Sequence, residues 1–596
     1  MNLRISLFLL NIFLFPILLF SQNTDSEITT SELKKNIGFL ASDSLKGRQP
    51  GTPEISVAAN YIQSHFKNSG LKFPKDKGYQ DFELVTGVSL GKENQFFFNG
   101  KYGEIAKDFI PLAFSKNAFL FAKMTFVGYG LSIKTDSIKW DDYKGIDVNG
   151  KWVVILRGHP ELSKSDSKFN EFSDERSKVL TATDKGASGV IFVTPVELSK
   201  SDELMSLNYD KSPAIADIPV VNITRKMMDT IIKNDKNLSI AGLETEINKT
   251  KKSNSFQLFE KLLIKTDVKL NKQTTQNVYG ILEGNDPILK NEYIVIGAHY
   301  DHLGMGGTGS GSRMPDTIAV HNGADDNASG VAGIIELAQK LSSIKNELKR
   351  SVIFVAFSAE ELGLLGSKYF AANLPVKSNQ IKTMINMDMI GRLQPNDPYI
   401  LISGTGTSAE SEDLLNLLTK KTKIPLRYSP EGYGASDHAS FYAINIPVFS
   451  LTTGAHEDYH TPFDDTDRIN FEGQKEVLDF AFLLAKELIN REKSLTFKES
   501  GPKTDAGRRS SLKVTLGIMP DFSGQSDKGL RADQVTNGGP AYKAGMLKGD
   551  IIIAIEGKPV KNIYEYMSRL KQLQKGQLIS VDVMRGDKKV VLLVQL

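Results

Sequence analysis

Cysteine is absent from this chain of 596 residues. Its absence excludes disulfides, zinc sites built on thiolates, cysteine nucleophiles and lipid attachment through cysteine. An excess of charge of one sign is also missing, because 73 Lys and Arg residues balance 70 Asp and Glu residues. Such a balance gives no electrostatic reason to expect nucleic acid or an anionic membrane surface as a partner. Apolar residues make up 40% and charged residues 24%, which are ordinary values for a globular protein.

Long apolar runs are missing as well, except at the start of the chain. Leu7 to Phe20 is almost wholly apolar, follows Arg4 and precedes the small residue Ser21. This pattern predicts a secretory signal over residues 1–21. The run is short for a stable membrane span, which needs about 20 residues, although an uncleaved anchor is the alternative. We therefore expect an exported protein, either periplasmic or secreted.

The rest of the chain divides into segments that differ in hydrophobic pattern and composition. The length favours about four domains at roughly 150 residues each. A first part, helical from Ser26 to Glu83, is separated from an α/β part by a β-rich insert. A charged stretch without periodicity predicts a linker before a final β-rich module. The predicted segments are 22–116, the insert 117–250, the main α/β part 251–491, the linker 492–510 and the final module 511–596.

The main α/β part alternates apolar strand patterns with helical patterns. Near-continuous apolar strands indicate a sheet that is buried on both faces. We therefore predict an α/β fold with a mixed, mostly parallel sheet and helices on both faces. The strand candidates are 293–301, 351–361, 381–390 and 446–454, and the helix candidates are 331–342, 362–370 and 471–489.

Histidine and carboxylate residues follow the predicted strands. Six of the eight histidines lie between residues 299 and 460. Ligand sites in open α/β sheets lie just beyond the carboxyl ends of the strands. Imidazole and carboxylate ligands without thiolate suit Zn, Mn or Co. The residues at these strand ends are His299, Asp301, Glu360, Glu361, Asp388 and His460, and Asp325 and Asp326 lie between the first two strands.

A bridged pair of metal ions would use this set economically. One bridging Asp, with one His and one terminal carboxylate for each metal, leaves open positions for water and substrate. The adjacent Glu360 and Glu361 suggest two roles, one metal ligand and one general base, since two carboxylates at one metal would repel. Each motif alone has a plainer interpretation, such as a surface ion pair or a helix start. Their joint occurrence at strand ends favours a site.

Six ordered motifs resemble those of a known family. They are AHYDH, NGADDNASG, SAEELGLLGS, NMDMIG, SDHASF and DYHTPFDD. In this order they resemble the secreted di-zinc aminopeptidases related to glutamate carboxypeptidase, and the resemblance covers about 30–115 and 258–491. It implies the zinc exopeptidase fold and two Zn²⁺ ions per chain, with Mn or Co as possible substitutes.

The resemblance also implies a role for each motif residue. His299 and Asp388 would share one zinc, while His460 and Glu361 would share the other. By the same resemblance, Asp326 would bridge the two ions and Glu360 would be the general base. Asp301 would be the carboxylate that orients the His299 ring.

Further residues are candidates for the substrate site. Asp437 and His438 of the SDHASF motif are candidates to line it, with a structural role as the alternative. His302 and His456 flank proposed ligands and are weaker candidates for shaping the pocket.

Two further segments resemble known domains. The insert is similar to a protease-associated (PA) domain through DYKGIDVNGKWVVILRG, TDKGASGVIFV and IPVVNIT. The final module resembles a PDZ domain through NGGPAYKAGMLKGDIIIAIEGKPV at 537–560. LGIMPD at 516–521 stands where the carboxylate-binding loop would be and departs from the usual Gly-Leu-Gly-Phe. The resemblance implies a C-terminal peptide as a possible ligand of this module.

The expected reaction is hydrolysis of the N-terminal peptide bond of peptide substrates. The metals would bind the carbonyl and a water, and Glu360 would transfer the proton. Three alternatives remain: a carboxypeptidase of the glutamate carboxypeptidase type, a single-zinc glutaminyl cyclase, and a non-catalytic binding protein on the same fold.

Overall fold

The computed structural model describes residues 27–74, 76–135, 137–209, 214–501, 514–520, 528–536 and 538–596. The predicted signal segment, 1–21, lies outside the described residues. Among the helices that are described, none is both long and apolar enough for a membrane crossing.

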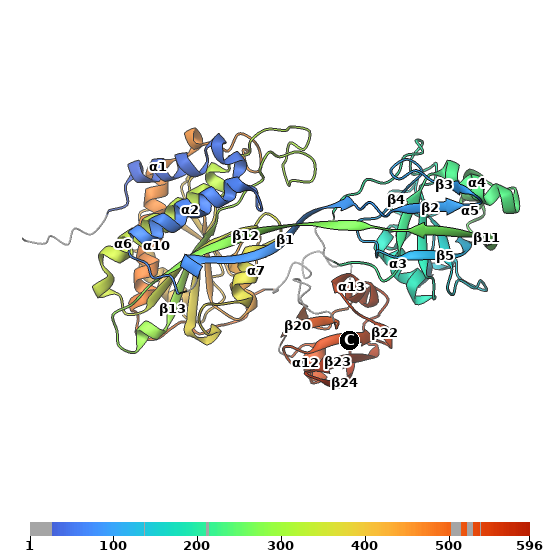
Figure 1. The fold of residues 1–596 in the computed structure, drawn as a ribbon. Coiled ribbons are helices and arrows are strands. Elements are labelled where there is room, and N and C mark those ends of the chain that lie inside the picture. Colours follow the sequence, from blue (N-terminus) through green and yellow to red (C-terminus); the bar gives the residue numbers. More distant parts are fainter. Residues whose placement is uncertain are drawn as a thin grey trace, which may run out of the picture.

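The α/β domain is built on one eight-stranded sheet (Figure 1). Its four central strands, β14, β13, β15 and β18, run parallel, so their carboxyl ends meet at one edge. The flanking strands form both parallel and antiparallel pairs. The sheet is therefore mixed and mostly parallel, which confirms the predicted fold class. In spatial order the strands are β1 (Tyr79–Leu90), β12 (Val268–Leu282), β14 (Ser351–Phe357), β13 (Tyr293–His299), β15 (Ile381–Met387), β18 (Val448–Thr452), β16 (Ile400–Ser403) and β17 (Leu426–Ser429).

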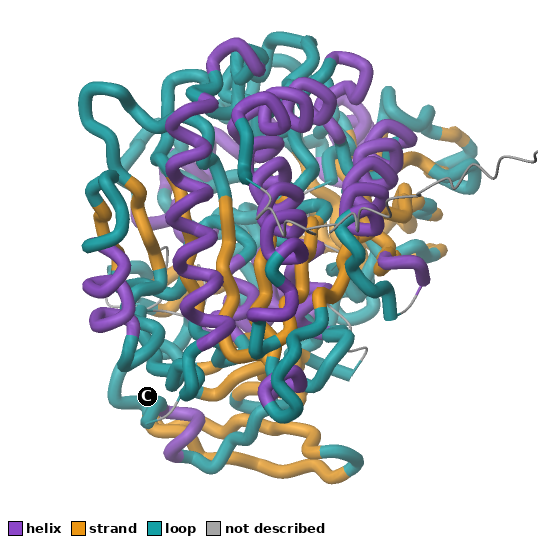
Figure 2. The backbone as a smooth tube through the Cα atoms, turned by 90° about the vertical axis from the view of Figure 1, so that its left-hand side faces the viewer, coloured by secondary structure: helices purple, strands orange, loops and turns teal. Residues whose placement is uncertain are grey.

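Helices cover both faces of this sheet, and Figure 2 shows long helices that run roughly alongside the strands. The central strands are buried along nearly their whole length, which explains their continuous apolar sequence. One face carries α1 (Thr30–Leu40), α2 (Pro53–Asn68), α6 (Gly330–Ser343), α8 (Ser411–Thr419) and α10 (Phe471–Asn490). The other face carries α7 (Leu365–Ala372) and α9 (His438–Ala443).

A long antiparallel ribbon of β1 and β12 leads from the α/β domain into the insert (Figure 1). The sequence predicts helix up to Glu83, but this is wrong at its end, because β1 begins at Tyr79. Much of β1 is only half-buried in the ribbon, so the apolar alternation that marks a strand is weak there.

The insert has its own eight-stranded sheet, which takes in strands on both sides of the predicted 117–250. In spatial order these are β3 (Lys101–Tyr102), β2 (Gln95–Phe98), β11 (Ser255–Lys265), β5 (Phe119–Val127), β8 (Trp152–Leu156), β9 (Gly189–Val193), β10 (Val220–Ile223) and β4 (Phe109–Pro111). A small hairpin joins β6 (Ser132–Lys134) to β7 (Lys139–Asp141), and the helices are α3 (Glu175–Asp184), α4 (Arg225–Lys236) and α5 (Ile240–Thr250).

The final module is a separate β-rich unit with its own core. Its edge strand β19 precedes β20, and a longer helix, α13, follows β22. The elements are β19 (Ile518–Pro520), β20 (Leu530–Val535), α12 (Pro540–Lys543), β21 (Ile551–Ile555), β22 (Lys558–Pro559), α13 (Ile563–Lys571), β23 (Leu578–Arg585) and β24 (Lys588–Gln595).

The segment predicted as a linker, 492–510, is described as far as Gly501, and this first half lies on the α/β domain. The Thr496 N–H and hydroxyl donate to Glu410, at 2.8 and 2.7 Å. The Lys498 N–H donates to the Thr407 carbonyl, and the Tyr442 hydroxyl donates to the Ser500 carbonyl. The chain therefore stays in contact with this domain as far as Gly501.

Candidate metal centre

The predicted ligands come together at the carboxyl edge of the central strands. His299 is the last residue of β13, and Asp388 directly follows β15. Glu360 and Glu361 follow β14, and His460 lies in the loop after β18. Asp326 comes from a buried helical turn, Ala324–Ser329, just before α6.

Asp326 lies between two imidazoles. Its Oδ1 is 3.2 Å from His299 Nε2, and its Oδ2 is 3.2 Å from His460 Nε2. Each ring also faces one further carboxylate: Asp388 Oδ1 is 3.5 Å from His299 Nε2, and Glu361 Oε2 is 3.2 Å from His460 Nε2. Asp326 therefore lies between two groups of side chains, each with one imidazole and one further carboxylate.

Main-chain carbonyls fix both rings. His460 Nδ1 donates to the Gly311 carbonyl at 3.2 Å, and His299 Nδ1 donates to the Asp301 carbonyl at 3.3 Å. Since a carbonyl can only accept, each ring carries its proton on Nδ1 when neutral. Each Nε2 lone pair then points at the carboxylates, as in a metal-ligating histidine.

Asp301 is fully buried and orients the glutamate pair. Its carboxylate accepts the N–H groups of Glu360, at 3.0 Å, and Glu361, at 3.3 Å. The same carboxylate is 3.8 Å from His299 Nδ1, whose closer acceptor is the Asp301 main-chain oxygen. Burial raises the pKa of Asp301 to about 6. Its side chain therefore acts mainly on the loop that carries the two glutamates.

A third imidazole, His302, also reaches the cluster. Its Nδ1 is 2.8 Å from Glu361 Oε1 and 3.8 Å from Asp326 Oδ2. Its Nε2 is buried and has no hydrogen-bond partner among the described residues. His460 fits a ligand better than His302, because only its Nε2 lies at 3.2 Å from both carboxylates.

The donor set fits a metal centre. Ligand atoms of His299, Asp326 and Asp388 lie within 4.8 Å of one another, as do those of His302, Asp326 and Glu361. Asp388 Oδ1 is buried and lacks a hydrogen-bond donor in the part of the chain that is described. So many buried carboxylates would repel without a cation. Nitrogen and oxygen ligands without sulfur suit zinc, manganese or cobalt.

The two adjacent glutamates differ electrostatically. Burial, followed by repulsion from Glu361 and Asp437, holds the pKa of Glu360 well above its ordinary value. Burial would also raise the pKa of Glu361, but hydrogen bonds from His302 and His460 bring it below the ordinary value. Glu361 is thus suited to remain a carboxylate ligand, and Glu360 to hold a proton.

The two candidate substrate residues are both buried. The charge of Asp437 acts on Glu360, which places this side chain near the cluster, and burial raises the pKa of Asp437 to about 7. Burial lowers the pKa of His438 to about 4, so the ring is neutral at physiological pH. Neither ring nitrogen of His438 has a partner among the described residues.

Arg48, which belongs to none of the six motifs, joins three segments beside the cluster. Its side chain is buried, with 1% exposed, and donates to the carbonyls of Tyr300 at 2.7 Å, Asn322 at 2.7 Å and Gly323 at 3.0 Å. It also donates to the Leu40 carbonyl at the end of α1. The segments it holds carry His299 and Asp326. Arg48 lies in the turn-rich stretch LKGRQPGT at 45–52, whose sequence does not indicate contacts with distant segments.

Asp464, of the DYHTPFDD motif, supports the shared carboxylate. Its Oδ2 accepts the N–H groups of Asp325 and Asp326, both at 3.0 Å. Asp325 in turn lies 3.3 Å from His456 Nε2, so His456 contacts the support of the cluster.

A cluster of histidines and carboxylates at the edge of an α/β sheet defines a metallohydrolase-like site, and comparison with known proteins gives its family. Residues 277–485 match peptidase family M28, residues 115–231 match the PA domain, and residues 514–596 match the PDZ domain. The chain is thus built from an M28 peptidase domain, a PA insert and a C-terminal PDZ domain. The resemblance inferred from the motifs is confirmed.

Curated relatives match mainly in the peptidase domain. Leupeptin-inactivating enzyme 1 of Streptomyces exfoliatus is 32% identical over 183 residues, which is 30% of this chain and 36% of that protein. Aminopeptidase YwaD of Bacillus subtilis is 27% identical over 229 residues, or 37% of this chain and 46% of that protein. The chain therefore spans less than half the length of these two relatives. A solved aminopeptidase from Aneurinibacillus sp. strain AM-1 is 23% identical, with 80% of this chain and 96% of that chain covered and a TM-score of 0.46.

Proposed function

We propose that the protein is a zinc-dependent aminopeptidase that holds two metal ions per chain. The observation that carries this proposal is the position of Asp326, with one carboxylate oxygen 3.2 Å from each of two imidazole Nε2 atoms. His299 and Asp388 would hold one ion, His460 and Glu361 the other, and Asp326 both.

The reaction assigned to this site is water attack on a peptide bond. Two zinc ions in such a site supply Lewis acidity and lower the pKa of water. Glu360 takes the proton of the attacking water and passes it to the leaving amine nitrogen. The raised pKa of Glu360 suits the second step, because a proton held there is available to the amine. Asp301 orients Glu360 by accepting its main-chain N–H.

The names of the relatives favour cleavage at the amino terminus. The relative from Bacillus subtilis, YwaD, is called an aminopeptidase, and several further relatives are called leucine aminopeptidases or probable ones. A carboxypeptidase would need a basic group free to bind the substrate carboxylate. Arg392, in the loop after Asp388, is already paired with Asp458. A non-catalytic relative would be expected to lack ligands, whereas the full predicted set converges here.

Three substrates separate the alternatives. Zinc-loaded protein should hydrolyse a leucyl anilide, and it should leave an N-blocked peptide intact. Release of the C-terminal residue from the N-blocked peptide would instead indicate a carboxypeptidase. Formation of pyroglutamate from an N-terminal Gln peptide would indicate a cyclase, and inertness toward all three after metal loading would indicate a binding protein.

We also propose that the protein is exported. The apolar run from Leu7 to Phe20 and the small residue Ser21 support this proposal. The amino-terminal sequence of protein recovered from the periplasm or the medium should begin at residue 22. Retention of the intact chain in the cytoplasm would contradict the proposal.

A further inference from the structure

The PDZ domain contacts the PA domain through the helices α13 and α3. The guanidinium of Arg569, on α13, pairs with both carboxylate oxygens of Asp184, the last residue of α3, with Nη2 2.9 Å from Oδ1. Only 2% of Arg569 is exposed. Nearby, Lys561 of the PDZ domain pairs with Asp217 of the PA domain. A planar, two-point pair with a buried guanidinium has defined geometry, unlike an ordinary surface ion pair.

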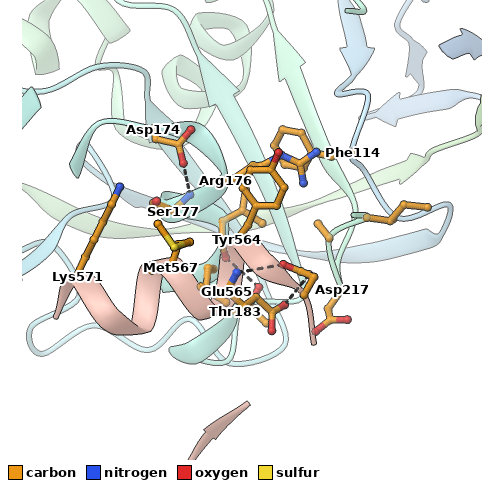
Figure 3. Close-up of a pocket in the computed structure, with 16 residues that line it drawn as sticks. Phe114, Asp174, Arg176, Ser177, Thr183, Asp217, Tyr564, Glu565, Met567 and Lys571 are labelled. Atoms are coloured by element: carbon orange, nitrogen blue, oxygen red, sulfur yellow. Dashed lines mark hydrogen bonds between the residues drawn. The ribbon is translucent and has the colours of Figure 1, made fainter. Parts of the chain in front are cut away.

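An arginine of the PA domain is stacked at the same contact. The Arg176 guanidinium lies 4.2 Å from the centre of the Phe114 ring and 4.6 Å from the centre of the Tyr564 ring. Figure 3 shows Arg176 beside Tyr564 of α13, with Met567 on the same helix facing α3. Arg176 is held in place by donating to the Ala214 carbonyl at 2.7 Å. The contact therefore joins stacking and apolar packing to the ion pairs.

The PDZ domain uses the outer face of α13 for this contact. Tyr566 and Leu570 are buried in the PDZ core, whereas Tyr564 and Ser568 lie on the other side of the helix and line the cleft toward α3. Strand β19 remains an edge strand, which pairs only with β20 among the described residues. An extended peptide can add to such an edge while α13 stays in contact with the PA domain.

We propose that the PA domain is the docking platform of the PDZ domain of the same chain, and that it holds the open β19 edge in a fixed place to capture an extended peptide substrate by its chain end. The docking stands on the contacts alone, while its consequence for substrates rests on the proposed peptidase function. A capture site at a fixed position raises the effective concentration of the captured peptide at the active site. A PDZ domain on a free tether would raise this concentration less. Long peptides should benefit, and dipeptide analogues should not.

The absence of cysteine makes the docking directly testable. Thr183→Cys on α3 and Ser568→Cys on α13 introduce two thiols that line the same cleft and no others. A short bis-maleimide should link them within one chain in high yield. The matched control combines Thr183→Cys with Val591→Cys, which places the second thiol on the exposed side of β24. Equal yields for the two pairs would overturn the docking.

Charge exchange tests the contacts that hold the domains together. Arg569→Glu should lower the cross-linking yield about five-fold or more, and adding Asp184→Arg should restore most of it. Because Arg569 also donates to the Pro559 carbonyl, Asp184→Asn serves as the milder variant on the PA side. Yields that do not change in Arg569→Glu and Asp184→Asn would show that these contacts do not position the PDZ domain.

Kinetics of the same variants test the consequence. Arg569→Glu should lower kcat/KM on a long peptide by about three-fold or more while leaving a leucyl anilide unchanged, and the charge-exchange pair should recover the long-peptide rate. Equal rates on the long peptide in all variants would overturn the capture role. Failure of the unmodified chain on both substrates would contradict the peptidase proposal, while the cross-linking result would still decide the docking.

Discussion

Glu360 and Glu361 are chemically identical neighbours with different surroundings, and their division of labour is the residue-scale test of the site. Glu360→Gln should retain metal and lose about 10²–10⁴-fold in kcat, since the proton acceptor is gone. Glu361→Gln should lose metal, because this carboxylate lies 3.2 Å from His460 Nε2. Metal content and kcat measured on both variants decide the matter, and equal metal loss in the two would refute the assignment.

Arg48 gives a second prediction at this scale. Arg48→Met removes the donor to the Tyr300, Asn322 and Gly323 carbonyls. The segments that carry His299 and Asp326 should then no longer be held at a fixed distance from each other. We expect zinc affinity to fall about 10–100-fold, as for other groups that orient metal ligands. Competition with a chelator of known affinity measures it.

Arg350→Met is the matched control for Arg48. Arg350 is equally buried and also donates to main-chain carbonyls, but it directly precedes β14, at the opposite end of the strand from the site. This variant should be less stable with unchanged zinc affinity. The same drop in affinity for both variants would mean that Arg48 acts only through global stability.

At the scale of elements, a buried acid ties α6 to α1 and α2. Asn36 donates to Glu336 at 3.0 Å, and the Tyr61 hydroxyl donates to Asn36 at 2.7 Å. Burial, followed by the charge of Glu32, raises the pKa of Glu336 from 4.5 to about 8. The folded chain thus holds a proton here at neutral pH that the unfolded chain releases. Its stability contribution is full below pH 4.5 and is lost as the pH rises toward 8.

Glu336→Gln should remove this dependence. The variant should exceed the parent chain in stability by an amount that grows between pH 4.5 and about 8, reaching about 1–3 kcal/mol. Thermal melts at several pH values measure the difference, with the exposed Glu347→Gln as control. A difference that shrinks toward alkaline pH would have the wrong sign and would contradict the raised pKa.

The accuracy with which the sequence predicts secondary structure differs between elements. The buried strands β13, β14 and β15 were located to within a few residues, because both of their faces are covered and their sequences are continuously apolar. Because the ends of these strands follow from the sequence, the proposed metal ligands could be assigned to one edge of the sheet from the sequence alone. The β1–β12 ribbon was missed in part, since its half-exposed residues carry no clear pattern.

The sequence predicts which residues form the site better than it predicts the contacts between them. Arg48 reaches residues more than two hundred positions away, and no local pattern reports such a contact. The approach of His302 to Glu361 depends on how two loops pack, which spacing along the chain does not determine.

At the scale of the whole molecule, the extent of the peptidase domain is testable by truncation. Residues 494–501 pack on this domain through Glu410, Thr407 and Tyr442. A chain that ends at Gly501 should fold and keep kcat/KM on a leucyl anilide, since every proposed ligand precedes residue 461. A chain that ends at Lys493 should melt at a lower temperature, by several degrees. Identical melting of the two would show that the segment contributes nothing, and inactivity of the longer one would place the PDZ domain in the catalytic machinery.

The metal content of the pure protein most directly tests the proposed two-metal centre around Asp326. Mature protein stripped of metal, reconstituted with zinc and freed of excess by gel filtration should contain two zinc equivalents per chain by elemental analysis. Asp326→Asn should lose both, because this carboxylate faces both imidazoles. A firm single equivalent in the unmodified protein would contradict the account and favour a single-zinc enzyme.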